Sequence, residues 1–232
     1  INASPITRML YKVVKAIGND NLSKIVFKSV HTKFGGHIEY LVSGGAALSI
    51  ETATILKTLG FYVLEGYGMT EAAPMITFTR PGRRKIGYTG DPLPNIEVKI
   101  ADNGEICLKG DNVMQGYYQR KDETDQILID GWLHTGDMGV RKSDGTLFIR
   151  GRCKTMILSA TGQNIYPEEI ESKLNNMPYV SESLIVERGK GLVAIVYPDY
   201  EQMDHNKLVI QDLEPIMEQV RQDLNKLVAP YE

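Results

Sequence analysis

The chain has 232 residues, of which 42 % are hydrophobic and 24 % charged, a composition that suits a globular protein with a sizeable core. Its 26 Lys and Arg against 29 Asp and Glu give a formal net charge of −3, which excludes a general attraction to nucleic acid or anionic membranes. Cys107 and Cys153 are the only cysteines, which excludes a disulfide framework and favours a reducing, cytoplasmic location. No apolar run reaches the length of a transmembrane helix.

The first 65 residues read as helices that alternate with short buried strands. Ser4-Pro5 predicts a helix start, apolar residues recur at helical spacing up to Ile17, and Gly18 ends the run. A second helix is expected over residues 22–33. The following pattern predicts a strand, a turn, a capped helix and a second strand, over residues 38–42, 43–47, 49–59 and 61–64. Such a unit predicts parallel strands with a ligand crevice at their C-terminal ends.

From about Ile86 the hydrophobic period changes to two. Turn signals at residues 102–104 and 143–145 predict two hairpins, and hence an antiparallel sheet or small barrel. After Gly151 we expect a strand, a helix, a hairpin and an amphipathic helix reaching Leu227, the first three over residues 156–158, 167–174 and 183–197. The predicted fold is α/β plus β, with an α/β domain, a barrel-like β subdomain and a small α+β domain over residues 1–94, 95–153 and 154–232.

Common catalytic fingerprints are missing from the sequence. There is no phosphate-binding G-x-x-x-x-G-K-[ST] loop, no dinucleotide-binding G-x-G-x-x-G and no G-x-S-x-G nucleophile elbow. The four histidines lack zinc-ligand partners at useful spacing, so we do not expect a metal ligand among them.

The most informative segment is Gly66-Tyr67-Gly68-Met69-Thr70-Glu71. Its glycines let the backbone approach a ligand, and Tyr67 offers a flat ring for stacking. Thr70 could bond a phosphate oxygen, and Glu71 could bind Mg²⁺. The alternative is a polar turn with a capping Thr/Glu pair, and the hexapeptide by itself does not decide between them.

Two further clusters carry polar groups. Asp137, between glycines at an expected strand start, suits a vicinal diol such as the ribose hydroxyls, and its alternative is a Gly-Asp turn. Arg152 and Lys154 lie in a basic junction that leads through Gly162 into the helix opened by Pro167. Taken singly, this junction is better explained as a linker before a well-capped helix.

The motifs in combination are much more specific. In order, they closely resemble core motifs of the adenylate-forming superfamily of acyl-CoA synthetases, luciferases and peptide-synthetase adenylation domains, over residues 42–48, 66–71, 104–118, 131–139 and 151–171. Residues 26–28 and 34–38 look most like the long-chain fatty acyl-CoA ligase branch. The resemblance implies an acid–thiol ligase that makes acyl-AMP and then acyl-CoA from a fatty acid, ATP with Mg²⁺, and coenzyme A.

The resemblance also implies roles for individual residues. It places Gly44, Gly45 and Ala46 in the adenine and acyl pocket. Tyr67 and Gly68 would lie against adenine, Thr70 would contact the α-phosphate and Glu71 would hold Mg²⁺. The ribose hydroxyls would be bound by Asp137 and Arg152. Lys154 would be the hinge of a mobile lid domain, and the Gly162 loop would meet the pantetheine arm of coenzyme A.

The sequence departs from the superfamily pattern in three places. The Ser/Thr/Gly-rich phosphate loop and the C-terminal lysine are missing, and Tyr88 follows Gly87 where a small residue is usual. We therefore expect a truncated chain that is inactive alone, with small molecules and no nucleic acid as partners. The alternatives are a domain that loads an amino or aryl acid onto a carrier protein and a non-catalytic nucleotide-binding module. The sequence leaves oligomeric state, acyl-chain length and peripheral membrane contact open.

Overall fold

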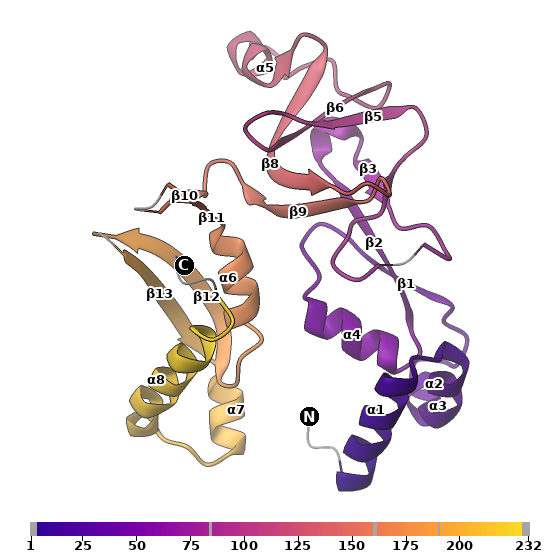
Figure 1. The fold of residues 1–232 in the computed structure, drawn as a ribbon, viewed down its shortest axis with the longest axis vertical. Helices are drawn as coiled ribbons and strands as arrows, with labels where there is room; N and C mark the ends of the chain where they lie inside the picture. Colours follow the sequence, from indigo (N-terminus) through magenta and orange to yellow (C-terminus); the bar gives the residue numbers. More distant parts are fainter. Residues whose placement is uncertain (1–3, 84, 160–161, 190, 229–232) are drawn as a thin grey trace. The chain divides into compact units, whose positions relative to one another are not determined.

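The computed structural model describes residues 4–83, 85–159, 162–189 and 191–228. Figure 1 shows their helices and strands in chain order. Packing divides the chain into two compact units. The first comprises Ile1–Ile100, Cys107–Thr135 and Arg141–Phe148, and the second comprises Ala101–Ile106, Gly136–Val140 and Ile149–Glu232. This division does not follow chain order, so the domain boundaries expected after residues 94 and 153 stay predictions.

The first helix, α1 (Pro5–Ile17), begins and ends where the sequence predicts. The Ser4 side chain accepts a hydrogen bond from the Thr7 amide at 3.2 Å, which satisfies one of the free N–H groups of the first turn. Gly18 ends the helix in the left-handed conformation, with φ of 67°.

The single helix expected over residues 22–33 is wrong, because the structure has two. α2 (Asp20–Val26) begins early since the Asn19 side chain accepts hydrogen bonds from two amides of its first turn, each at 3.0 Å. Phe27 then leaves helical geometry, with φ of −101° and ψ of 27°, and its side chain is buried. α3 (Lys28–Lys33) follows, and its His31 ring stacks on Phe61.

The β-α-β unit is confirmed. β1 (Tyr40–Ser43) and β2 (Tyr62–Gly68) pair directly with each other in parallel. The helix α4 (Ile50–Thr58) connects them along the chain, and Ser49 caps its N-terminus. β2 is longer than the expected strand because β3 (Met75–Phe78) pairs with its second half in the antiparallel sense. The short β4 (Asp91–Pro92) completes the sheet order β1-β2-β3-β4.

A second, five-stranded sheet contains both predicted hairpins. Its order is β5-β6-β8-β7, and β9 also pairs with β8. The short helix α5 (Lys121–Ile127) precedes β7. The strands are β5 (Ile96–Ile100), β6 (Glu105–Gly110), β7 (Leu128–Ile129), β8 (Trp132–Arg141) and β9 (Leu147–Arg152). The antiparallel sheet is therefore present, and a barrel-like closure stays a prediction.

The turn between β8 and β9 predicts a dependence of stability on pH. Thr146 donates two hydrogen bonds to Asp144 Oδ1, from its hydroxyl at 2.6 Å and its amide at 3.0 Å. These bonds, and then nearby Lys85, lower the pKa of Asp144 from 3.8 to about 2. A carboxyl whose pKa is depressed by folding stabilises the protein above its ordinary pKa and loses that contribution as pH falls through the folded value.

We therefore expect the thermal midpoint of the wild-type chain to fall between about pH 4 and pH 2 more steeply than that of an Asp144→Asn variant. Asparagine keeps an acceptor oxygen in the turn but does not titrate. Melting curves at closely spaced pH values test this, and parallel pH profiles for the two proteins would contradict it.

In the second unit, two helices pack on a hairpin. β12 (Val180–Arg188) and β13 (Gly191–Pro198) pair in the antiparallel sense, and Lys190 of their predicted turn lies outside the described residues. α6 (Pro167–Leu174) matches its prediction, whereas α8 (Leu213–Leu224) ends before Leu227. The buried core is Ile165, Ile170, Leu174, Val180, Ile185, Val220 and Leu224.

Several short elements complete this unit. β10 (Ile157–Leu158) is the strand expected near residues 156–158, and it pairs with β11 (Asn164–Ile165). α7 (Tyr200–His205), capped by Asp199, and the 3₁₀ turn η2 (Ile210–Asp212) were not predicted.

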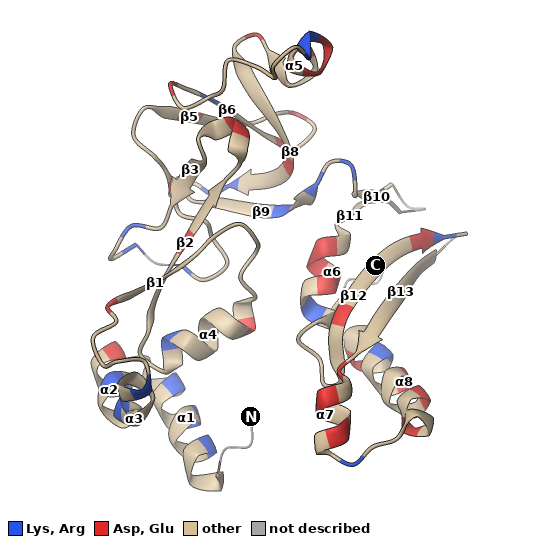
Figure 2. Ribbon diagram, turned by 180° about the vertical axis from the view of Figure 1, so that it is seen from behind, with Lys and Arg blue, Asp and Glu red and all other residues tan. Residues whose placement is uncertain are grey.

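The small net charge hides an uneven distribution over the helices (Figure 2). The charged residues of α1 are all basic, whereas the Asp and Glu residues of α7 make it acidic. Within the part of the chain that the structure describes, no helix combines the length and apolarity needed to cross a bilayer.

Candidate functional site

The glycine-rich loop after β1 lies beside β2, within the first unit. Gly44, Gly45 and Ala46 are exposed, and Gly45 has φ of 85°, a conformation that favours glycine. A Cβ on Gly44 would lie 3.4 Å from the Gly66 carbonyl oxygen, so the loop passes close to the second glycine motif. The structure thus brings two predicted motifs together at the C-terminal ends of parallel strands, the usual ligand side of an open α/β sheet.

The hexapeptide motif was expected to follow β2, but its first three residues, Gly66 to Gly68, are the last residues of that strand. Tyr67 is half-buried and faces Thr77 of β3 in the pairing register. Gly68 approaches the next turn so closely that a Cβ would collide with the Pro74 carbonyl oxygen. The neighbouring Met69 amide donates to that same oxygen at 2.7 Å, which holds the turn against the strand.

Thr70 and Glu71 form the 3₁₀ turn η1 (Thr70–Ala72) at the end of β2. The capping alternative is wrong, because the cap residue is Met69 and no side chain caps this turn. Thr70 is exposed and Glu71 is half-exposed. The Glu71 Oε1 atom accepts a hydrogen bond of 2.6 Å from the Tyr117 hydroxyl, a contact that the sequence analysis missed.

Asp137 lies inside β8, so neither the expected strand start nor the Gly-Asp turn is correct. It is only 7 % exposed, and its Oδ1 is 3.1 Å from an Arg152 guanidinium nitrogen. The two residues predicted to share the ribose therefore lie together in the second unit. Gly136, which precedes Asp137, donates its amide to Glu105 Oε1 at 2.8 Å and accepts at its carbonyl from the Cys153 amide at 2.8 Å.

The predicted hinge and coenzyme A residues lie farther along the second unit. Lys154 is exposed in a turn closed by a hydrogen bond from the Met156 amide to the Arg152 carbonyl. Gly162 has φ of 80° and donates its amide to the Ser159 carbonyl at 2.9 Å. Residues 160 and 161 of the same predicted loop lie outside the described residues.

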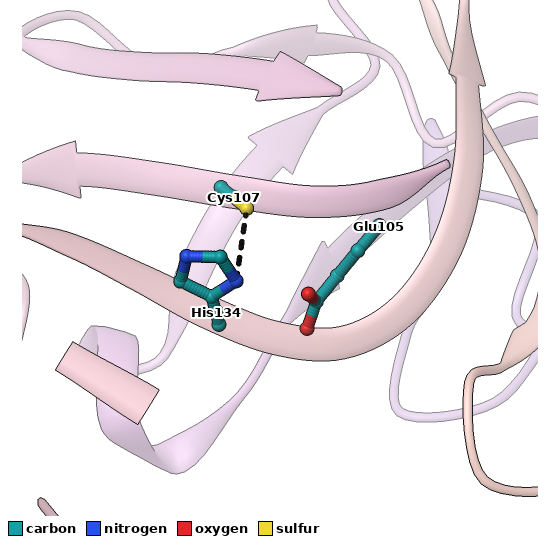
Figure 3. Close-up of side chains that lie close together, drawn as sticks. All are labelled: Glu105, Cys107 and His134. Atoms are coloured by element: carbon teal, nitrogen blue, oxygen red, sulfur yellow. Dashed lines mark hydrogen bonds between the residues drawn. The ribbon is translucent and has the colours of Figure 1, made fainter. Parts of the chain in front are cut away.

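The two cysteines have different surroundings. Cys107 on β6 is fully buried, and its Sγ lies 3.5 Å from His134 Nδ1 on β8 (Figure 3). The spacing rules for metal ligands do not detect this thiol–imidazole pair, because the two residues are 27 positions apart. Burial, and then the carboxylates of Glu105 and Asp137, raise the pKa of Cys153, so its thiol is kept protonated at neutral pH.

The chain is similar in sequence to proteins of one known family. Residues 5–118 match the family described as AMP-binding enzyme. Long-chain-fatty-acid–CoA ligase FadD15 of Mycobacterium tuberculosis is 32 % identical over 182 residues, which cover 78 % of this chain and 30 % of that protein. Long-chain-fatty-acid–CoA ligase 6 of Rattus norvegicus is 38 % identical over 202 residues, which cover 80 % of this chain and 29 % of that protein.

A solved structure is similar as well. O-succinylbenzoate coenzyme A synthetase from Bacillus subtilis, in complex with ATP and magnesium, matches with a TM-score of 0.63 and 34 % identity. The match covers 69 % of this chain and 36 % of that one. This chain spans about 30 % of the length of the curated relatives that it matches. The family match, these relatives and the ordered motifs together show that the chain belongs to the AMP-binding enzyme family.

Proposed function

We propose that this chain is part of an ATP-dependent acyl-CoA ligase that activates a long-chain fatty acid. A carboxylate oxygen of the acid attacks the α-phosphorus of ATP, which gives acyl-AMP and releases pyrophosphate. The thiol of coenzyme A then attacks the acyl carbonyl carbon and displaces AMP. The names of relatives that are 32 to 40 % identical support this reaction and this acid class.

One observation carries the nucleotide part of the proposal. The loop after β1 packs against Gly66 where the parallel strands end, and the same edge presents Tyr67, Gly68 and Thr70. We infer that Gly44, Gly45 and Ala46 line the adenine and acyl pocket. In the same site Tyr67 would stack on adenine beside Gly68, and Thr70 would donate to the α-phosphate.

The Asp137–Arg152 pair supports the ribose assignment. Asp137 is nearly buried beside Arg152, and a carboxylate can accept hydrogen bonds from two neighbouring hydroxyls. Arg152, whose side chain is 56 % exposed, neutralises that charge and retains further N–H donors for the sugar. We propose that these two residues bind the ribose of ATP.

Glu71 is the residue that fits Mg²⁺. Mg²⁺ prefers oxygen ligands and is commonly held by one or two protein carboxylates together with substrate phosphates. Glu71 is half-exposed, and its hydrogen bond from Tyr117 engages Oε1, so Oε2 can serve as a ligand. When bound, Mg²⁺ would supply positive charge against the negative charge that shifts during phosphoryl transfer.

The second step is assigned to the last part of the chain. We propose that the Gly162 loop meets the pantetheine arm of coenzyme A and that Lys154 is the hinge that brings it there. Both residues are exposed, and the positive φ of Gly162 forms a tight turn without a side chain that would obstruct a ligand. A cytoplasmic location and the small mobile domain stay predictions.

The acid class is tested by ATP–pyrophosphate exchange with a ligase that contains this chain, using fatty acids of graded length beside an aryl acid. The aryl acid belongs in the test because the O-succinylbenzoate enzyme is 34 % identical. Exchange that is fastest with long-chain acids supports the proposal. Exchange only with aryl or amino acids would favour the alternative loading domain, and nucleotide binding without exchange would favour the non-catalytic module.

We also expect purified residues 1–232 to form no acyl-CoA. The chain corresponds to about 30 % of the length of its relatives, and losing even one oriented electrostatic group typically lowers a rate by about 10²–10³. The measurement is thioester formation from fatty acid, ATP and coenzyme A. Robust turnover by this chain would contradict the expectation.

In an active ligase containing the chain, Asp137→Ala and Glu71→Ala should have different kinetic effects. Ribose contacts are equal in the ground and transition states, so Asp137→Ala should raise the ATP KM, by roughly 10- to 100-fold for a lost charged hydrogen bond. Glu71→Ala should lower kcat by a larger factor than it raises the ATP KM, because the Mg²⁺ that Glu71 would hold offsets charge that shifts during phosphoryl transfer. Steady-state kinetics for both variants decide this, and equal losses of kcat with unchanged ATP KM would refute it.

A further inference from the structure

The segment after β6, residues 111–118, holds the turn that carries Thr70 and Glu71 by hydrogen bonds. The Met114 amide donates to the Glu71 carbonyl at 2.8 Å. The Asn112 side-chain amide donates to the carbonyl oxygens of Ala72 and Met75, at 2.7 and 3.1 Å. All of these residues belong to the first unit. The backbone of the Glu71 turn is therefore held by hydrogen bonds from residues about forty positions later in the chain.

The same segment also holds the Glu71 side chain. The Tyr117 hydroxyl donates to Glu71 Oε1 at 2.6 Å, a short bond to a charged acceptor. A carboxylate has two oxygens, and this contact engages one of them.

Tyr117 is in turn positioned by the first turns of α5. Its amide donates to the Thr124 hydroxyl at 2.9 Å, and its carbonyl accepts from the Arg120 amide at 3.2 Å. At Gly116 a Cβ would lie 2.8 Å from a Thr124 methyl carbon, so the chain passes close to the helix there. The hydroxyl of Tyr117 thus reaches Glu71 from a backbone that is itself anchored.

We propose that Tyr117 is a positioning residue, which holds the Glu71 carboxylate in one orientation and leaves Oε2 for the divalent cation of a bound metal–nucleotide. The inference rests on the proposed function of Glu71. A half-exposed glutamate otherwise samples several rotamers, and ordering it on metal binding costs conformational entropy. The hydrogen bond from Tyr117 fixes the Glu71 rotamer before any metal binds, as residues that hydrogen-bond to metal ligands do in known metal sites.

The first test needs no nucleotide. Tyr117→Phe removes only the hydroxyl, and Tyr118→Phe is its matched control because Tyr118 is 88 % exposed. A crystal structure or side-chain NMR couplings should show Glu71 in several rotamers in Tyr117→Phe and in one rotamer in the wild type and in Tyr118→Phe. A Glu71 carboxylate with unchanged order and position in Tyr117→Phe would overturn the positioning role.

The second test measures binding of a fluorescent ATP analogue to the 232-residue chain, with Mg²⁺ and with EDTA. We expect Tyr117→Phe to weaken the Mg²⁺-dependent affinity by about tenfold and to leave the Mg²⁺-free affinity unchanged, because a hydrogen bond to a charged group is lost. In a Glu71→Gln background the same substitution should have no further effect, since Tyr117 acts through Glu71. Additive losses would mean that Tyr117 acts on the nucleotide by another route.

The two tests separate failure of this inference from failure of the proposed function. If Glu71 loses its order in Tyr117→Phe while wild-type binding does not respond to Mg²⁺, the side-chain contact exists but the metal–nucleotide role of both residues is overturned. If wild-type binding requires Mg²⁺ and Glu71 while Tyr117→Phe binds like the wild type, only the role of Tyr117 is overturned.

Discussion

Replacing Gly68 by alanine is expected to destabilise the first unit by about 3 kcal/mol, the upper part of the usual range for overpacking. The added Cβ would lie 2.8 Å from the Pro74 carbonyl carbon and 2.9 Å from Met75 Cα, and it would collide with the Pro74 oxygen. These are backbone atoms, so no side-chain rotation relieves the contact. The hydrogen bond from the Met69 amide to Pro74 would be lost as the two strands separate.

The single tryptophan, Trp132, lies in the first unit and reports its unfolding by fluorescence. Gly82→Ala is the matched control, because Gly82 has φ of 85° but open space around its Cβ position. Backbone strain alone should then cost about 1–2 kcal/mol. Urea titrations of both variants provide the comparison. A Gly68→Ala midpoint equal to that of Gly82→Ala would show that the turn can move away from the strand at little cost.

Local signals in the sequence explain why much of the fold was predictable. Ser4 and Gly18 limit α1, and Ser49 caps α4, because capping depends on residues within one turn of the helix end. The period-two segments and their Asn-Gly and Asp-Gly turns likewise locate both hairpins of the second sheet. In each case the interactions that decide the structure join residues that are close along the chain.

Errors arose where tertiary contacts decide the structure. Phe27 interrupts the expected helix, and its side chain is buried, a tertiary contact that helix propensity does not register. β2 extends through the glycine motif because β3 pairs with it, although glycines usually indicate the end of a strand. Asp137 lies within β8, although the glycines on both sides of it resemble a turn in the sequence.

The site was predictable to the extent that its residues are contiguous. Tyr67, Gly68, Thr70 and Glu71 were found because they form one short segment. The Tyr117–Glu71 hydrogen bond joins residues 46 positions apart, and the Cys107–His134 pair joins residues 27 apart. A single sequence has no periodic signal for such contacts, which depend on how β6 and the segment after it pack.

The hinge proposal leads to the largest expected effect on the reaction. In a ligase containing this chain, Lys154→Pro should leave acyl-AMP formation near the wild-type rate and slow thioester formation by about 10²-fold or more, as expected for a misplaced reacting group. Proline fixes φ near −65° and restricts the residue before it, here Cys153. Lys154 is exposed in the turn between Arg152 and Met156, so the substitution constrains the backbone without disturbing a core.

Lys154→Pro both restricts the backbone and removes a positive charge. Lys154→Ala is the control that separates these two effects, because alanine removes the ammonium group and leaves the backbone free to rotate. If Lys154 is a hinge, this control should support both half-reactions at close to wild-type rates. Acyl-AMP formation and thioester formation from supplied acyl-AMP are measured separately for both variants. Equal losses in the two half-reactions of Lys154→Pro would indicate misfolding. Thioester formation at the wild-type rate would identify Lys154 as an ordinary exposed turn residue, because a hinge held by proline could not carry the Gly162 loop to the acyl-adenylate.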